Sequence, residues 1–396
     1  MAHKYNGATQ YIWQHADWPN MTVDMQALAG LVAETNLLRG QLMGRVSMFG
    51  FEEQNTSMLE TMTSEIVHSS KIEGQMLSAD SVRSSLATQL GLKYDGLPPT
   101  DHYIEGVVQV MLDATHNFSR PLCDKRMFGW HHALFPNGYS GMYKINVGKW
   151  REGKEAMQVV SGAMGKERVH YEAPPSEEVP RMMNDLLEWI EADDSKTDPL
   201  IKAAIAHLWF VTIHPFDDGN GRICRTITEM LLSRADHTGK RYYSLSSQIL
   251  QNRKAYYDCL EHAQKGGMDV TEWVAWFLST LKDAINASLT KTENVVRKRQ
   301  FWNRHEQTPF NERQRKMLNR LFDGFEGKLN SSKWYKICHC SQDTATRDLN
   351  DLVNKGVLRK TDDGGRNTNY ELNEQYTYIY ERKDRTLMAR ALAARV

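Results

Sequence analysis

Apolar residues recur at helical spacing through most of this chain, most clearly in its first third. From about Met25 to Gly91 they follow the i, i+3, i+4 spacing of an amphipathic helix. The positions are Leu28, Leu31, Val32, Leu38 and Leu42, and then Leu59, Met62 and Ile66. Residues 101–116 and 125–135 continue the pattern. We therefore predict that this region is helical.

The pattern changes between residues 147 and 171. Two short β-compatible runs, 156–160 and 168–171, flank the turn-forming sequence Ser-Gly-Ala-Met-Gly. Two prolines and Ser176 end this stretch, and Glu177 and Glu178 then fall in the first turn of a new helix, where the helix dipole favours carboxylates. We predict a β-hairpin here, followed by helices to about residue 290.

Charge and a helix breaker mark the approach to a last domain, 311–396. Within residues 291–320, nine Lys or Arg stand against three Asp or Glu, and Pro309 interrupts the stretch. We predict a linker over 291–310. The domain itself is predicted to contain helices at 311–322, 331–338 and 341–355, Gly356, and strands at 357–360 and 369–372 around a loop with Asp362 to Gly365. This order is typical of a winged helix-turn-helix.

Composition narrows the class of protein. The 396 residues suffice for two or three domains, and 41% of them are apolar, as in globular proteins. The formal net charge is zero, so no global charge attracts nucleic acid or a membrane. The first thirty residues contain no apolar signal core, and no run approaches the roughly 18 apolar residues of a membrane span. Five scattered cysteines indicate a reducing cytoplasm.

The strongest chemical signal is HPFDDGNGRICR, residues 214–225. A core helix precedes it and another helix follows. A Gly-rich loop that opens onto a helix N-terminus directs backbone N–H groups outward and forms an anion cradle. Arg222 and Arg225, three apart, share a face of the following turn and suit a polyphosphate. Asp218 is a hard oxygen ligand for phosphate-bound Mg²⁺, and His214 has the pKa range of a general base.

Each of these groups also has an ordinary structural interpretation. A histidine at a helix end is usually structural, Asp-Asp-Gly-Asn-Gly is usually a turn, and paired arginines usually form a solvated face. Their conjunction within twelve residues favours a site that handles phosphate. It is not a P-loop, because GxxxxGK[ST] does not occur.

The motif resembles the signature HxFx[DE]GNGRxxR of Fic (filamentation induced by cAMP) proteins, and every specified position is filled. The resemblance covers roughly residues 100–290. It implies a mainly α fold, a Fic-type helical core with a small β-hairpin flap at 147–171. It also implies that the chain moves AMP from ATP-Mg to a Ser, Thr or Tyr hydroxyl of a target protein or of itself, and releases pyrophosphate.

The resemblance also assigns roles to the motif residues. His214 takes the proton of the incoming hydroxyl, Phe216 anchors the loop, and Asp218 holds Mg²⁺. The anion cradle is lined by Gly219, Asn220 and Gly221. Arg222 supports the phosphates and Arg225 receives the γ-phosphate. The related Doc branch, which phosphorylates, has Lys at the position of Gly221, so Gly there favours nucleotidyl transfer.

Two further parts of the core are candidates for contacts. Asn252, Tyr256 and Tyr257 fall at about the distance at which the family contacts adenine and ribose, although tyrosines here are equally expected in a core. The hairpin resembles the flap that aligns a target segment by strand pairing, and its alternative is a plain structural hairpin. His131, His132 and His207 lie in apolar helices and are interpreted as structural.

An inhibitory element is predicted in HSSKIEG, residues 68–74. It fills the pattern [ST]xxxE[GN], which lies N-terminal to the core in one class of the family. Ser69 and Glu73 are one helical turn apart, so the hydroxyl can orient the carboxylate, and Gly74 can end the helix close to the site. We expect Glu73 within salt-bridge reach of Arg225, in the same chain or across a homodimer.

The domains are therefore expected at 1–95 (N-terminal helical domain), 96–290 (Fic core), 291–310 (linker) and 311–396 (winged helix). The predicted recognition helix carries Asp343, Asp348 and Asp351 beside Arg347 and Lys355, and acids oppose a phosphate backbone. Arg366 and the basic stretch 291–320 would compensate. We favour protein interaction or dimerisation there over DNA binding. The alternative function is a DNA-binding regulator with a nucleotide-sensing or inactive core, and a third is removal of AMP at the same site.

Overall fold

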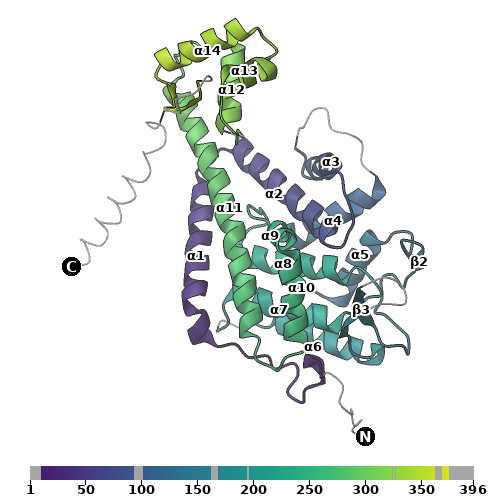
Figure 1. Ribbon diagram of the computed structural model, residues 1–396. Helices are drawn as coiled ribbons and strands as arrows, with labels where there is room; N and C mark the ends of the chain where they lie inside the picture. The colour runs from purple at the N-terminus through teal and green to yellow at the C-terminus, as the bar shows by residue number, and fades with distance from the viewer. Residues whose placement is uncertain are drawn as a thin grey trace, which may run out of the picture. The chain divides into compact units, whose positions relative to one another are not determined.

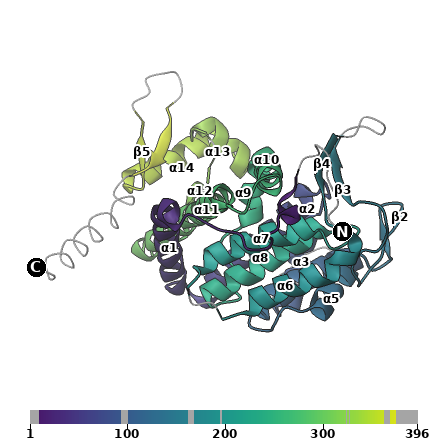
Figure 2. The same ribbon diagram turned by 90° about the horizontal axis from the view of Figure 1, so that it is seen from below.

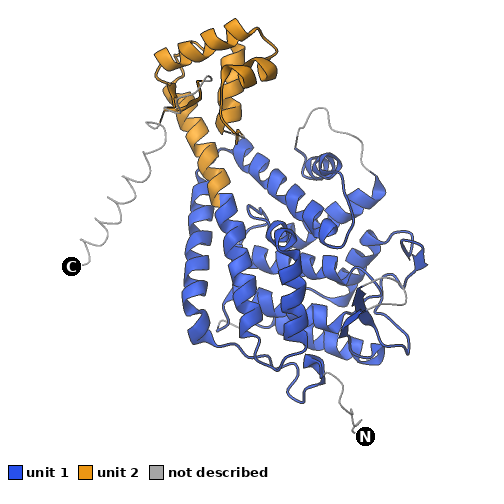
Figure 3. Ribbon diagram, viewed as in Figure 1, with its two compact units in different colours: residues 1–288 blue, residues 289–396 orange. Residues whose placement is uncertain are grey.

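The computed structural model describes residues 10–92, 101–161, 168–193, 196–322, 324–325, 327–361 and 368–373. It divides into two compact units, Met1–Ser288 and Leu289–Val396 (Figure 3). The predicted turn at 162–165, the loop with Asp362 to Gly365 and Arg366 lie outside the described residues.

The first unit is helical, as the apolar periodicity predicts (Figure 1). Its helices before the hairpins are η1 (Ile12–Gln14), α1 (Met25–Ser47), α2 (Phe51–Ile72), α3 (Ala79–Gln89), α4 (His102–His116) and α5 (Asp124–Leu134). After the hairpins come η2 (Ser176–Glu178), α6 (Val179–Glu191), α7 (Pro199–Ile213), α8 (Asn220–Asp236), α9 (Leu245–Gln251) and α10 (Arg253–Gln264). The long α11 (Thr271–Arg304) begins in this unit and ends in the second.

Side chains of the expected kind begin the main helices. Asp24 accepts hydrogen bonds from the amides of Gln26 and Ala27 at the start of α1, and Asp101 accepts one from Ile104 at the start of α4. Helix α7 begins with Pro199 in its first turn. Its residues Leu200–Ile213 are buried except for Lys202, so α7 is the central helix of the unit.

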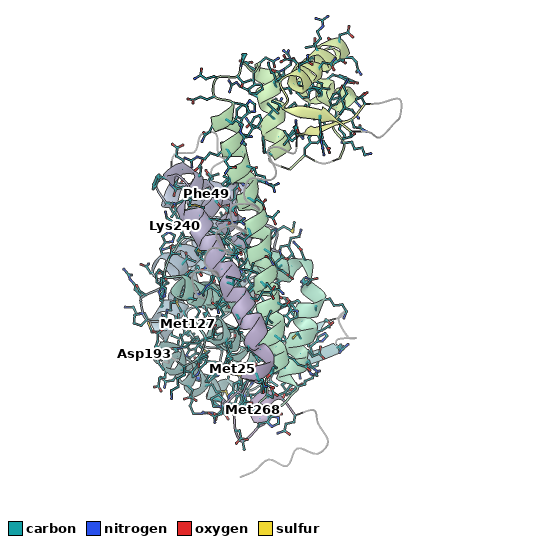
Figure 4. All side chains as sticks on the ribbon, turned by 90° about the vertical axis from the view of Figure 1, so that its left-hand side faces the viewer. Met25, Phe49, Met127, Asp193, Lys240 and Met268 are labelled. Atoms are coloured by element: carbon teal, nitrogen blue, oxygen red, sulfur yellow. The ribbon has the colours of Figure 1, made fainter. Side chains whose placement is uncertain are left out.

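Helices α7 and α8 pack against each other and place the motif between them (Figure 1 and Figure 2). Helix α4 packs on α8 and α5, and α2 packs on α9 and α3. The N-terminal segment is tied to the start of α11: Thr22 donates to the carbonyl of Met268, and Val270 donates to that of Thr22. Figure 4 shows Met25 and Met268 at the same end of α1. This packing brings the end of α2 and the start of α8 together.

Two small antiparallel hairpins complete the unit. The predicted hairpin is present as β3 (Gln158–Ser161) and β4 (Arg168–Glu172), with a register shift between Val159 and Val160. A second pair, β1 (Tyr139–Ser140) and β2 (Tyr143–Lys144), was not expected from the sequence. Among the described residues, no helix has both the length and the apolar character needed to cross a bilayer.

The second unit has its own core. It contains α12 (Glu312–Phe322), α13 (Ser331–Cys338), α14 (Gln342–Asn354) and the antiparallel strands β5 (Leu358–Lys360) and β6 (Tyr370–Leu372). Trp334 and Leu349 are fully buried in it. Phe301, near the end of α11, and Phe310 belong to the same core. Most of the stretch 291–310 is therefore helix and core, not an irregular connection.

Candidate active site

The motif loop leaves α7 at His214, whose backbone is left-handed (φ 51°). Gly219 begins α8 with φ 81°, and a Cβ there would lie 2.7 Å from a ring carbon of Phe135. Asn220 closes the loop, since its side chain accepts from the amide of Phe216 and donates to the carbonyl of Phe216. This side chain is 2% exposed and serves the loop, so Asn220 can line the predicted anion cradle with its backbone only.

Phe216 lies at the centre of an aromatic cluster beneath the loop, as the anchor role requires. Its side chain is fully buried and stacks on the His131 ring at 4.2 Å, with Trp150 at 5.1 Å. His131 donates from Nε2 to the carbonyl of Asp218 and accepts the amide of Gly148 on Nδ1. His131 therefore connects the motif loop to the segment before the hairpin and is structural.

The His214 imidazole has the properties of a neutral base. Its Nδ1 lies 3.3 Å from the carbonyl of Val211. Because a carbonyl only accepts, Nδ1 carries the proton and Nε2 keeps its lone pair. Burial lowers the pKa of His214 to about 4. Arg151 fixes the backbone here, because its Nε donates to the carbonyl of His214 at 2.8 Å.

Asp218 is the motif carboxylate that the sequence predicts as a ligand of Mg²⁺. Its Oδ1 accepts the amide of Gly219 at 2.6 Å, and its Oδ2 accepts the hydroxyl of Ser140. Asp217 instead accepts the amide of Asn146. Among the described residues, no cluster of three His, Cys, Asp or Glu could hold a metal ion. The Asp218 carboxylate would therefore have to share a bound Mg²⁺ with oxygen ligands such as those of a phosphate or of water.

Arg225 forms the ion pair expected from the sequence. Its Nη2 lies 2.8 Å from Oε1 of Glu73, and the two side chains are 2% and 31% exposed. The proximity of Glu73 raises the pKa of Arg225 against the opposing effect of burial. Arg225 also donates from Nε to the hydroxyl of Ser69 and from Nη2 to its carbonyl, both at 2.8 Å. The hydroxyl of Ser69 therefore contacts the guanidinium, not the carboxylate that we expected it to orient.

The end of α2 has the geometry that brings Glu73 to the motif. Gly74 is left-handed (φ 82°), its amide donates to the carbonyl of Lys71, and the amide of Gln75 donates to that of Ser70. Across the interface, a Cβ on Gly221 would lie 2.0 Å from Oε1 of Glu73. The Glu73 carboxylate can therefore lie here only because Gly221 has no side chain.

Arg222 lies on the same turn of α8 and is also buried. Its Nη1 donates to Oε1 of Gln75 and to the hydroxyl of Tyr103, each at 2.9 Å. The guanidinium also lies over the Phe135 ring at 4.7 Å. The alternative of a solvated arginine face is therefore wrong for both motif arginines.

The three nucleotide candidates in α9 and α10 differ in environment. Tyr256 is 1% exposed and its hydroxyl lies 2.9 Å from Nε2 of His207, so it is a core residue and the nucleotide role is a misassignment. Tyr257 is partly exposed, and the Arg253 guanidinium lies over its ring at 5.0 Å. Asn252 is exposed at the junction of the two helices.

Four residues of the site were missed by sequence reasoning: Ser140, Arg151, Gln75 and Tyr103. Each contacts a motif residue from a distant part of the chain, between 63 and 147 residues away. Of these four, only Gln75 could have been predicted from the sequence, because it directly follows the SSKIEG element that was already assigned to the site.

Comparison with known proteins identifies the class of domain. Residues 121–232 match the model of the Fic/DOC family, and residues 11–92 match a domain of unknown function (DUF4172). The solved structure of a Fic family protein from Desulfovibrio desulfuricans G20 covers 89% of this chain and 98% of its own, with a TM-score of 0.51 and 24% identity. The chain therefore contains a Fic/DOC domain, and the resemblance seen in the motif is confirmed.

Named relatives are similar to a part of this chain. Protein adenylyltransferase fic-1 of Caenorhabditis elegans is 28% identical over 125 residues, which are 30% of this chain and 23% of the relative. Probable protein adenylyltransferase aq_aa38 of Aquifex aeolicus is 29% identical over 102 residues, 26% of this chain and 29% of the relative. The chain thus matches less than a third of the length of either of these relatives.

Proposed function

We propose that this protein transfers AMP from ATP to a hydroxyl side chain of a target protein, or of itself, and that residues 69–74 hold it in an inhibited state. The observation that carries the proposal is the 2.8 Å ion pair between Glu73 and Arg225, the last residue of the complete Fic motif. The names of the relatives, protein adenylyltransferases, point to the same reaction.

The motif residues would share the work of transfer. The target oxygen attacks the α-phosphorus, the bond to the β-phosphate oxygen breaks, and pyrophosphate leaves. Nε2 of His214 accepts the hydroxyl proton, which its lone pair allows. The backbone amides at the start of α8, with Arg222 and Arg225, would bind the triphosphate. Asp218 would hold Mg²⁺, which supplies charge neutralisation of the phosphates when bound.

Tyr257 and Asn252 are the remaining candidates for contact with the nucleoside, since Tyr256 is in the core. The β3–β4 hairpin would align an extended target segment. Val160 and Val169 are exposed on it, so an incoming strand would meet apolar side chains as well as backbone groups.

The Glu73 carboxylate would inhibit by occupying the place of the γ-phosphate on Arg225. Removal of AMP, in which such a glutamate assists, is the third candidate for the same site. We further propose the division into an N-terminal helical domain (1–95), a Fic core (96–290) and a winged-helix domain (311–396), and the stretch 291–310, expected as a linker, is instead the end of α11 and part of the last core. The five cysteines are free thiols, which supports action in a reducing cytoplasm.

The last domain has a second candidate function, binding of duplex DNA. Asp348, counted above against DNA, is 5% exposed and accepts hydrogen bonds from Asn311 and Arg313, so it does not face a partner. Residues 289–396 contain 22 Lys or Arg against 14 Asp or Glu, whereas residues 1–288 contain 27 against 35. Protein interaction or formation of a homodimer remains the other role for this domain.

One experiment separates these functions. Full-length protein is incubated with labelled ATP and Mg²⁺, as wild type, Glu73→Gly and His214→Ala, with and without a cell lysate. We expect stronger labelling by Glu73→Gly and none by His214→Ala. Equal labelling by wild type and Glu73→Gly would remove the inhibitory role. A salt-dependent shift of duplex DNA without any labelling would support the DNA-binding regulator instead.

A further inference from the structure

The turn that carries Glu73 contacts the second motif arginine as well. Directly after Gly74, the Gln75 side chain accepts a hydrogen bond from Nη1 of Arg222 at 2.9 Å. The hydroxyl of Tyr103, at the start of α4, accepts from the same nitrogen and donates to Oε1 of Gln75 at 2.5 Å. Burial raises the pKa of Tyr103, so this hydroxyl keeps its proton at neutral pH.

The backbone makes these contacts part of one hydrogen-bonded turn. The amide of Gln75 donates to the carbonyl of Ser70, whose neighbour Ser69 is bound by Arg225. Arg253 donates from Nε to the carbonyl of Ile72, the last residue of α2. The end of the helix is therefore held by three arginines, two of which belong to the motif.

We propose that inhibition uses two latches, Glu73 on Arg225 and Gln75 on Arg222, with Tyr103 as the residue that positions Arg222 for the second. This inference rests on the proposed function and specifies its regulation. Both guanidinium groups that would bind the triphosphate are engaged by protein oxygens. ATP must therefore displace the amide of Gln75 in addition to the carboxylate of Glu73.

The two latches differ in chemistry and so in strength. Gln75 offers a neutral oxygen, which a phosphate oxygen displaces from a guanidinium more easily than it displaces a carboxylate. Loss of Gln75 alone is expected to raise the affinity for ATP by roughly tenfold, the effect of one hydrogen bond to a charged group. Loss of both side chains should exceed the effect of losing Glu73.

The test uses full-length Gln75→Ala, Gln75→Glu and, as a matched control, Met76→Ala, whose side chain is adjacent and 75% exposed. Amide hydrogen exchange of a peptide covering residues 70–76 reports on the latch without any catalysis. We expect faster exchange in Gln75→Ala, slower exchange in Gln75→Glu because a carboxylate pairs better with Arg222, and no change in Met76→Ala. Thermal unfolding checks that each variant is folded.

Binding of ATP with Mg²⁺, measured by calorimetry, should strengthen in Gln75→Ala and weaken in Gln75→Glu. Wild-type exchange and wild-type affinity in both Gln75 variants would overturn the proposal. AMP transfer by Glu73→Gly and by Glu73→Gly/Gln75→Ala is measured separately. Absence of transfer in both would refute the proposed function, while the exchange data would still decide whether the second latch exists.

Discussion

Replacing Glu73 by Gln isolates the charge in its contact with Arg225, because the two side chains have the same shape. The pair is 2.8 Å apart, and the guanidinium is buried while the carboxylate is 31% exposed. A hydrogen bond between charged groups contributes about 1.5–3 kcal/mol, and partial exposure to water reduces this to about 1–2 kcal/mol. That difference converts to roughly a five- to thirtyfold larger population of unlatched protein.

The assay is the initial rate of AMP incorporation from labelled ATP at a concentration well below saturation. We expect Glu73→Gln to be faster than wild type by that factor and Glu73→Gly to be faster still. Lys71→Ala, an exposed side chain on the same helical turn, is the control and should match wild type. A rate for Glu73→Gln equal to that of wild type, with Glu73→Gly elevated, would show that shape and not charge holds the latch.

Three further predictions follow from the structure. Because the pKa of His214 is lowered to about 4, kcat/KM of Glu73→Gly should stay flat from pH 8 down to about pH 5; a loss centred near pH 6.5 would contradict a depressed base. Stability should fall between pH 6.5 and about 3, since His207 is buried neutral with its pKa lowered to about 3 and the unfolded chain binds that proton first; urea titrations across this range measure it. Gly221→Ala should displace the Glu73 carboxylate, whose oxygen lies 2.0 Å from the new Cβ, and hydrogen exchange at residues 70–76 should therefore rise above that of wild type; wild-type exchange would show that the turn can shift to accommodate the methyl group.

Local signals in the chain predicted much of this protein. The helix predicted at 331–338 has the bounds Ser331–Cys338, and the hairpin and the helices around the motif lie where periodicity and turn residues place them. The reason is that apolar spacing and helix caps act between residues a few positions apart, so neighbouring residues contain the information. The motif at 214–225 could likewise be identified from the sequence, because its residues follow one another along the chain.

Tertiary packing decided which of these groups meet. The sequence presented Tyr256 as a nucleotide contact, but packing of α10 against α7 buries it beside His207. In the sequence, Asp348 counts against DNA binding, but in the folded domain it is buried and paired with Arg313. Periodicity indicates which face of a helix is buried but not what lies opposite, so such roles depend on partners far along the chain.

The turn that carries Glu73 also depends partly on local sequence and partly on tertiary packing. The SSKIEG element and the motif are identifiable in the sequence. Together they predicted that Glu73 approaches Arg225. The contact of Gln75 with Arg222 joins residues 147 positions apart. The hydroxyl of Ser69 binds the guanidinium of Arg225 and not the carboxylate of Glu73. Both contacts depend on how α2 packs beside α8. A hydrogen bond needs its partners within about 3 Å, and only the assembled fold sets that distance.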